Sequence, residues 1–354
     1  MLRALAFSCL GLLVVAQEVK PLENVQGLED VEEAFKAFQR DFSKFYDDIE
    51  KPARFSAFAK NYRYIQQQNT KNLSYTLGIN KFADESTEEF KKKRTGAVKV
   101  PPKAPKSLPG QLAKQGYRLP SSFDWRSEGA VTPVVNQEDC QNCWAISAIG
   151  ALEGAWKLKT GKLIQLSFQQ VGDCSYGYEN GDFFLAGCGK GDPWSAFDWM
   201  SQSGMAICTE ASYPFEGRDT EFCMEYAEDC KVGLPEGFLD VNFPYMAVET
   251  SNVRMLMEAV ATQPVSASLE LSQPFQLYRG GVYSTDSCNN APDHSILVVG
   301  YGTERGMDYW LVKNSWGDEW GEWGYIKLER GAWCNHLYYG AYPLLSEDRR
   351  LMYP

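Results

Sequence analysis

The sequence QEDCQNCWAIS, residues 137–147, places Cys143 at the start of a predicted helix. The helical pattern runs from Cys143 to about Lys159 and stops at Thr160-Gly161, a typical helix end. A thiol at a helix N-terminus has a lowered pKa, because the helix dipole favours an anion there. We therefore interpret Cys143 as a nucleophile, which needs a nearby base.

Two histidines, His294 and His336, are the only imidazoles in the chain. His294 begins an apolar, strand-like run at residues 293–302, and Asn314 lies in a second such run at residues 309–317. If the two runs are adjacent strands, the Asn314 amide can fix the tautomer of the His294 ring. We interpret His336 as a surface or packing residue. So few histidines exclude His-rich metal sites, and we predict neither a metal nor a cofactor.

Composition and charge narrow the class of protein. The 354 residues suit two or three domains, and 44% hydrophobic with 23% charged residues excludes wholesale disorder and fibrous repeats. A formal net charge of −11 argues against nucleic acid and anionic membranes as partners, because both require a basic face. Residues 1–16 carry one positive charge, an apolar run and a small-residue end, as signal peptides do. The run is too short to span a membrane, so we expect a lysosomal or extracellular protein of the secretory pathway.

The cysteines divide the chain into two parts. Of the 10 cysteines, Cys9 lies in the expected signal peptide and the others all follow residue 139. An odd number therefore remains, which leaves at least one free thiol in an oxidising compartment.

The cysteine-free part is predicted to be helical. One narrow stripe of a helix carries Phe35, Phe38, Phe42 and Phe45. A second helical face, at steps of three or four residues, carries Glu50, Arg54, Phe58, Asn61, Ile65 and Asn69. Pro52 fits only the first turn of a helix, so this second helix should begin near residue 51. The periodicity alone would also fit a plain amphipathic helix in a bundle. Asn72 begins a glycosylation sequon.

After residues 78–84 the chain turns basic and loses its pattern. Residues 91–116 combine KKKR, several prolines and many lysines, which predicts an exposed linker where proteolysis concentrates. A compact domain should begin near Leu119-Pro120.

These features together resemble a papain-family cysteine protease of the cathepsin L type. The face from Glu50 to Asn69 matches the proregion pattern E-x3-R-x3-F-x2-N-x3-I-x3-N, and residues 78–84 match G-x-N-x-F-x-D. The mature-domain motifs match around Gln137, Cys143-Trp144, His294, Asn314-Ser315-Trp316-Gly317 and Trp320-Gly321.

The resemblance implies an architecture as well as a family. A signal peptide at residues 1–16 would precede an inhibitory proregion with linker at 17–118 and a papain-like peptidase domain at 119–354. The implied fold class is α+β, with a helical left domain packed against a β-barrel-like right domain and preceded by a helical proregion.

The resemblance also implies the role of each catalytic residue. Cys143 would be the nucleophile and His294 its acid/base partner. Asn314 would orient His294, Trp316 would shield that hydrogen bond from water, and Gln137 would donate to the oxyanion. The implied activity is that of a thiol-dependent endopeptidase with a thioester intermediate. Its implied partners are protein and peptide substrates, its own proregion and cystatin-type inhibitors, and we expect a monomer.

Departures from the family pattern bear on the substrate subsites. The family reads Q-G-x-C-G-S-C where this chain has Glu138, Gln141 and Asn142 in place of Gly, Gly and Ser. Gln141 is expected to narrow the S1 subsite. Gly191 matches the glycine whose backbone pairs with substrate, and Lys190 places a charge near S3 unless it is simply solvated. The positions that match the S2 lining are Pro193, Ser268, Ser295 and Tyr339.

The disulfide pattern follows from the same resemblance. It implies Cys140–Cys188, Cys174–Cys223 and Cys288–Cys334, and leaves Cys143 free. Two further cysteines, Cys208 and Cys230, are either buried thiols or a fourth bridge, and we favour the bridge because the compartment is oxidising.

Two other classes of protein compete with this interpretation. An inactive homologue that binds or regulates would explain the substitutions around Cys143, but it does not explain the intact Gln, Cys, His and Asn. A disulfide-rich structural module explains neither the odd thiol nor the proregion pattern. An exopeptidase of the family's dipeptidase form would need a histidine pair that this chain lacks.

Overall fold

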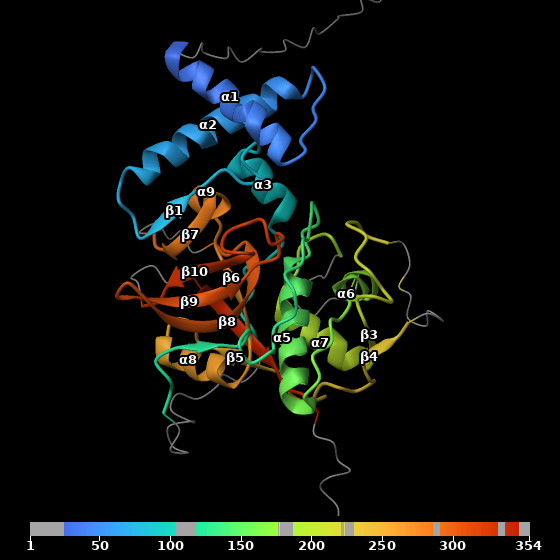
Figure 1. The fold of residues 1–354 in the computed structure, drawn as a ribbon. Coiled ribbons are helices and arrows are strands. Elements are labelled where there is room, and N and C mark those ends of the chain that lie inside the picture. Colours follow the sequence, from blue (N-terminus) through green and yellow to red (C-terminus); the bar gives the residue numbers. More distant parts are fainter. Residues whose placement is uncertain are drawn as a thin grey trace, which may run out of the picture. The chain divides into compact units, whose positions relative to one another are not determined.

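The computed structural model describes residues 25–103, 118–175, 177, 187–220, 223, 230–285, 291–331 and 337–346 (Figure 1). The expected signal peptide, the middle of the expected linker, Cys288, Cys334 and His336 lie outside these residues. Within the described ranges, no helix is long and apolar enough to cross a membrane. The chain divides into two units, Met1–Phe45 and Tyr46–Pro354, which are described separately.

The first unit contains helix α1, Val25–Asp41. Phe35 and Phe38 stack along it with ring centroids 6.1 Å apart. The predicted stripe extends to Phe42, whose ring centroid lies 5.3 Å from that of Phe38 just after the helix ends. It is wrong for Phe45, whose side chain is 89% exposed. Ser43 explains the early end, since its φ of 51° turns the backbone out of the helical conformation.

The second unit begins with the segment that we call the prosegment, residues 46–103. It holds helix α2 at Lys51–Asn69, strand β1 at Tyr75–Leu77 and helix α3 at Thr87–Arg94. Helix α2 begins where Pro52 predicted. On the predicted face Phe58, Asn61 and Ile65 are buried.

Helix α3 corrects the predicted linker. The basic residues 91–94 form the last turn of this helix rather than the start of an exposed segment. Ser86 caps the helix by accepting a hydrogen bond from the Glu89 backbone N–H at 3.2 Å, and the basic side chains at the other end favour the helix dipole.

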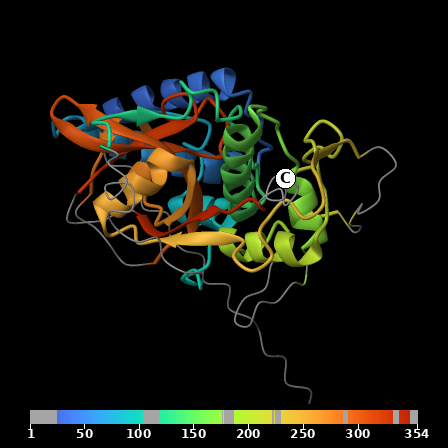
Figure 2. The ribbon, with the colours of Figure 1, turned by 90° about the horizontal axis from the view of Figure 1, so that it is seen from below.

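Two helices of the remaining chain pack against α5, Cys143–Thr160. This helix has the predicted bounds and ends at Gly161, whose φ of 76° is the left-handed conformation that glycine allows. It lies between the sheet and the helices α6, Phe168–Cys174, and α7, Pro193–Ser203 (Figure 2). A small hairpin follows, made of β3 at Ile207–Cys208 and β4 at Val232–Leu234.

The main sheet has nine strands. Its order is β1-β7-β10-β9-β8-β6-β11-β5, with β2 paired to β8. The bounds are β2 Phe123–Asp124, β5 Tyr245–Val248, β6 Val265–Leu269, β7 Tyr278–Tyr283, β8 His294–Glu304, β9 Met307–Lys313, β10 Tyr325–Glu329 and β11 Leu337–Pro343. Helices α8, Val253–Thr262, and α9, Gln273–Gln276, lie in the connections between strands. Over the described residues this path is an open sheet and not a closed barrel.

Strand β1 of the prosegment forms one edge of that sheet. It pairs antiparallel with β7, where Tyr75 faces Gly281 and Thr76 faces Gly280. The sheet of the second unit therefore includes a strand that comes from the prosegment.

Three disulfides lie in the described part of the chain. They join Cys140 to Cys188, Cys174 to Cys223 and Cys208 to Cys230. The last of these is the bridge that the sequence favoured for the two additional cysteines. Cys143 is the free cysteine among these residues, as predicted.

Candidate active site

Cys143 is brought to His294 by the junction of helix α5 with strand β8. The Cys143 thiol is buried at the first residue of α5. The backbone N–H of Ser295, the residue after His294, donates to Cys143 Sγ at 3.4 Å. The thiol therefore comes from helix α5 and the imidazole from strand β8, at the interface where the helix packs against the sheet.

Asn314 meets His294 because β8 and β9 are antiparallel neighbours. The pairing of Leu297 with Lys313 brings the end of β9 beside the start of β8. As a result His294 Nε2 and Asn314 Oδ1 are 2.8 Å apart. An amide oxygen can only accept, so Nε2 carries the proton and Nδ1 is the nitrogen left to exchange one. The predicted pair is confirmed as a contact.

Trp316 covers this pair and also holds Gln137. Its ring stacks on the His294 ring with centroids 4.9 Å apart and planes inclined by 28°. Its Nε1–H donates to Gln137 Oε1 at 3.1 Å, and the Ser315 hydroxyl donates to the same oxygen at 2.5 Å. The Gln137 oxygen is thus occupied, which points its Nε2 donor toward carbonyl oxygens, those of Cys140 at 2.7 Å and of Arg94 at 3.2 Å.

The prosegment crosses this group of residues in an extended conformation. The Gly191 N–H donates to the Gly96 carbonyl at 2.7 Å, and the Val98 N–H donates to the Gly191 carbonyl at 3.3 Å. Between them, Ala97 pairs with Gly191 in a parallel bridge and donates its N–H to the Asp293 carbonyl at 3.0 Å. The backbone of residues 96–98 therefore covers Cys143 and His294.

Aromatic packing holds helix α3 against the same place. The Phe90 ring meets the Trp316 ring edge-on with centroids 4.8 Å apart, and the Phe82 ring does so at 6.0 Å. Both phenylalanines are almost fully buried. The side chain that covers His294 is thus itself covered by the prosegment.

Burial sets the protonation states of the Cys143 thiol and the His294 imidazole. Burial, with a smaller effect of Asp293, raises the pKa of Cys143 to about 11, although N–H groups of Ser295 and Gly96 favour the thiolate. Burial also lowers the pKa of His294 to about 4, against the effect of its bond to Asn314. The predicted low thiol pKa is therefore wrong for the precursor, because loss of water outweighs the helix dipole. At neutral pH both groups are uncharged.

The subsite residues predicted from the sequence fall into two groups. Ser268 and Ser295 face each other across β6 and β8, and Tyr339 faces Ser268 from β11. Tyr339 also meets Trp194 edge-on at 5.9 Å, next to Pro193 at the start of α7. These four predicted residues are brought to one region.

The second group lies beside the prosegment. The Gln141 side-chain amide donates to the Lys92 carbonyl in helix α3, and its effect on the S1 subsite stays a prediction. Gly191 packs against the Trp144 ring, where any side chain would collide. Lys190 is exposed, which agrees with the solvated alternative.

Sequence reasoning missed the residues that hold the prosegment in place. Arg94 was assigned to a linker, yet its buried guanidinium bonds Glu85 at 2.6 Å and Asp139 at 2.6 Å. The available signal was the capping pattern of Ser86 and Glu89, which predicts that a helix continues through the basic run.

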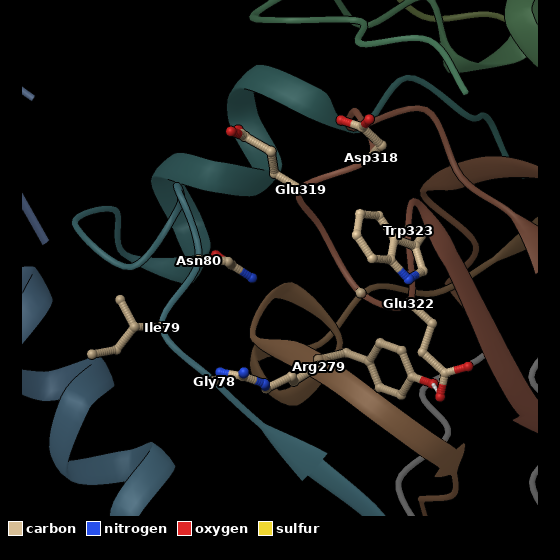
Figure 3. A pocket seen from close by; sticks show the side chains of 10 residues that line it. Gly78, Ile79, Asn80, Arg279, Asp318, Glu319, Glu322 and Trp323 are labelled. Atoms are coloured by element: carbon tan, nitrogen blue, oxygen red, sulfur yellow. Dashed lines mark hydrogen bonds between the residues drawn. The ribbon is translucent and has the colours of Figure 1, made fainter. Parts of the chain in front are cut away.

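A separate cavity of about 550 Å³ lies where residues 78–80 run past strand β7 (Figure 3). Its lining comes from the prosegment, from strand β7 and from the loop between β9 and β10. The lining residues are Gly78, Ile79, Asn80, Tyr278, Arg279, Asp318, Glu319, Gly321, Glu322 and Trp323. It includes none of the predicted site residues.

Comparison with protein families gives two matches. Residues 119–344 match the family described as "Papain family cysteine protease". Residues 35–90 match the "Cathepsin propeptide inhibitor domain (I29)". The first match contains the whole group around Cys143, and the second contains most of the prosegment.

Individual proteins are similar over most of the chain. The chain is 42% identical over 282 residues to "Probable cysteine protease RD21B" of Arabidopsis thaliana, covering 79% of this chain but only 57% of that relative. It is 37% identical to "Cysteine proteinase 2" of Zea mays, covering 88% and 84% respectively. Among solved structures, the recombinant stem bromelain precursor has a TM-score of 0.76 at 33% identity, covering 90% of this chain and all of that one. The proform of the Amb a 11 cysteine protease, a ragweed pollen allergen, has a TM-score of 0.78 at 31% identity, covering 92% and 98%.

Proposed function

Because the chain belongs to the papain family of cysteine proteases, we propose that it is the precursor of a thiol endopeptidase with Cys143 as nucleophile. The observation that carries the proposal is the hydrogen bond between His294 and Asn314 beside the buried Cys143 thiol, which accepts from the N–H next to His294. The chain's own residues 96–98 lie across this site. One chain thus carries both the proposed active site and the segment proposed to inhibit it.

The proposed chemistry gives each of these residues one role. Cys143 Sγ attacks the carbonyl carbon of a peptide bond after passing its proton to His294 Nδ1. Asn314 holds Nε2–H and so keeps the ring in the orientation and tautomer that Nδ1 chemistry requires. The Gln137 amide, together with the Cys143 N–H, stabilises the oxyanion.

The two halves of the reaction use the same imidazole, that of His294, but different protons. The imidazolium of His294 gives it to the leaving amine, and a thioester to Cys143 remains. His294 then takes a proton from water, which hydrolyses the thioester and frees the thiol.

The prosegment lies at the site without being cleaved. The position of its backbone explains why. The Gly96 N–H, rather than a carbonyl carbon, faces the Cys143 sulfur. The same contact removes water from the thiol and the imidazole, so neither is charged. Inhibition in this proposal is both steric and electrostatic.

The domain limits and the compartment are part of the proposal. Residues 1–16 act as signal peptide, 17–118 as proregion and 119–354 as peptidase, with processing between about residues 100 and 120. The three disulfides and the exposed sequon at Asn72 favour the secretory pathway, in a lysosome or outside the cell. Cystatin-type inhibitors would bind the exposed site of the processed monomer.

One experiment tests the proposed function. The purified precursor is acidified, its new N-terminus is sequenced, and the product is treated with a thiol-directed inhibitor and with a peptide library. We expect a cleavage between about residues 100 and 120, labelling at Cys143 and endopeptidase activity. Full activity of the uncleaved precursor at neutral pH would contradict the proregion's role. A processed product that neither cleaves nor is labelled would favour an inactive, binding homologue.

A further inference from the structure

We infer that Asp139 selects substrates with a basic residue just after the cleaved bond. This inference rests on the proposed protease function. Its basis is a peptide already seated at the site, the prosegment, whose basic side chains contact this carboxylate. Asp139 lies in the loop between Gln137 and Cys143, at a position to which sequence analysis gave no function.

The prosegment supplies both ionic partners of Asp139 in the described chain. Arg94 Nη2 is 2.6 Å from Asp139 Oδ1, and Lys93 Nζ is 3.6 Å from Asp139 Oδ2. The other carboxylate on Arg94, that of Glu85, belongs to the prosegment as well. When the prosegment leaves, Arg94, Lys93 and Glu85 leave together, and Asp139 stays behind without these cations.

The same loop also holds the peptide main chain. The Gln141 amide donates to the Lys92 carbonyl, and the Gln137 amide donates to the Arg94 carbonyl at 3.2 Å. These two contacts bind any sequence, because every peptide has carbonyl oxygens. The carboxylate of Asp139 can then distinguish basic from neutral or acidic side chains on the bound peptide.

The position relative to Cys143 identifies the side of the substrate that is read. Residues 97 and 98 of the prosegment pair with Gly191 on one side of the sulfur. Gly96 reaches the sulfur itself, and Lys93 and Arg94, on the other side of Gly96 along the chain, contact Asp139. In the proposed function Gly191 pairs with the acyl part of the substrate, so Asp139 faces the leaving-group part.

The exposure of the Asp139 side chain sets the expected size of the preference for a basic residue. The Asp139 side chain is 58% exposed even with the prosegment in place. An ion pair at such a position is weak, so we expect a preference of about two- to fivefold in kcat/KM that diminishes with salt.

The test compares quenched peptides that differ at one residue. The acid-processed enzyme is given sets with Arg, Gln or Glu at the first or the second residue after the scissile bond. We expect the order Arg, Gln, Glu at one of these positions at low salt. Asp139→Asn should bring the Arg to Gln ratio close to one, Asp139→Lys should reverse the order, and Asp139→Glu should retain it.

A matched control removes a different carboxylate. Glu236, an exposed residue in the turn after β4, is replaced by Gln, and the Arg to Gln ratio should stay as in the wild type. If the Asp139 variants do not fold, the loss of the wild-type preference at high salt supplies the same information.

Each outcome has one meaning. Equal rates for Arg and Gln in the wild type, or a preference that survives in Asp139→Asn, would overturn the inference and leave the protease function standing. Failure to cleave any peptide would overturn the proposed function and the inference with it.

Discussion

A Cβ atom on Gly96 would lie 1.6 Å from the backbone carbonyl oxygen of Gln141. Backbone atoms cannot move aside as a flexible side chain can, so residue 96 must be glycine for the prosegment to lie across Cys143. The closeness of these two backbones is what allows the Gly96 N–H to reach the sulfur.

Replacing Gly96 by Ala should therefore release the site without breaking the fold. We expect the Gly96→Ala precursor to react with a thiol-directed inhibitor at neutral pH at least tenfold faster than the wild type, a change of about 1.4 kcal/mol in the closed state. Gly172→Ala is the control, because a Cβ there makes only ordinary contact, 3.5 Å from the Gly187 Cα. Equal reactivity of wild type and Gly96→Ala would show that the segment does not lie as described.

The two histidines should behave very differently. His294→Ala removes the proton carrier, and we expect kcat/KM to fall by about a hundredfold or more. His336→Ala should stay within a few-fold of the wild type, since it has no part in the proposed chemistry. Each variant is processed by an added protease, so that self-cleavage does not decide the result. Similar losses in both variants would refute the assignment of His294.

Acid should open the precursor through His294. Burial lowers the pKa of this imidazole from 6.5 to about 4, so the closed state holds it neutral while the open state can protonate it. The stabilisation of the closed state is complete above pH 6.5 and is lost progressively as the pH falls toward 4. Limited proteolysis of a Cys143→Ser precursor across this range measures the opening. In His294→Gln the opening between these pH values should flatten.

Glu89 should contribute at lower pH. Partial burial tends to raise the pKa of its carboxyl, but hydrogen bonds and charge from Arg54 and Lys93 outweigh this and lower it below the usual 4.5. A carboxyl with a lowered pKa stabilises the folded form above its usual value, and this is lost as the pH falls below it. Glu89→Gln should therefore loosen the prosegment at neutral pH and reduce the additional opening below about pH 4.5. Arg54 bonds both Glu89 and Glu50, each at 2.8 Å.

Tyr339 should limit the size of the P2 side chain. It faces Ser268 across the strands and meets Trp194 edge-on, which places its ring beside the residues predicted to line S2. We expect the enzyme to prefer Val, Leu or Pro at P2 over Phe or Arg, in a graded way, because each methylene is worth only about 1–3 kcal/mol. Tyr339→Ala should raise kcat/KM for P2 Phe relative to P2 Val. A wild type that already prefers Phe, unchanged by the substitution, would show that Tyr339 does not line the pocket.

Local signals in the sequence predicted local structure well. Pro52 marked the start of α2, and Gly161 marked the end of α5, because each residue acts on its own turn of backbone. The contact between His294 and Asn314 was also predictable, since two apolar runs close in sequence readily form adjacent strands.

Contacts between distant segments were not predictable in this way. The bond from Arg94 to Asp139 joins a helix end to a loop, and no periodicity in either segment indicates it. The raised thiol pKa depends on how completely residues 96–98 exclude water from Cys143, which is a property of the assembled structure. Phe45 was misassigned because the helical spacing of the phenylalanines continues in the sequence past Ser43, where the backbone turns out of the helix.

The pairing of β1 with β7 has a kinetic consequence. While the chain is intact, strand β1 is tethered to its partner, and its local concentration there does not depend on how much protein is present. One cut between the two strands turns the same pairing into an encounter between two molecules. A nicked precursor would then hold together in a concentrated vesicle and come apart on dilution, so the moment of release depends on volume as well as on acid.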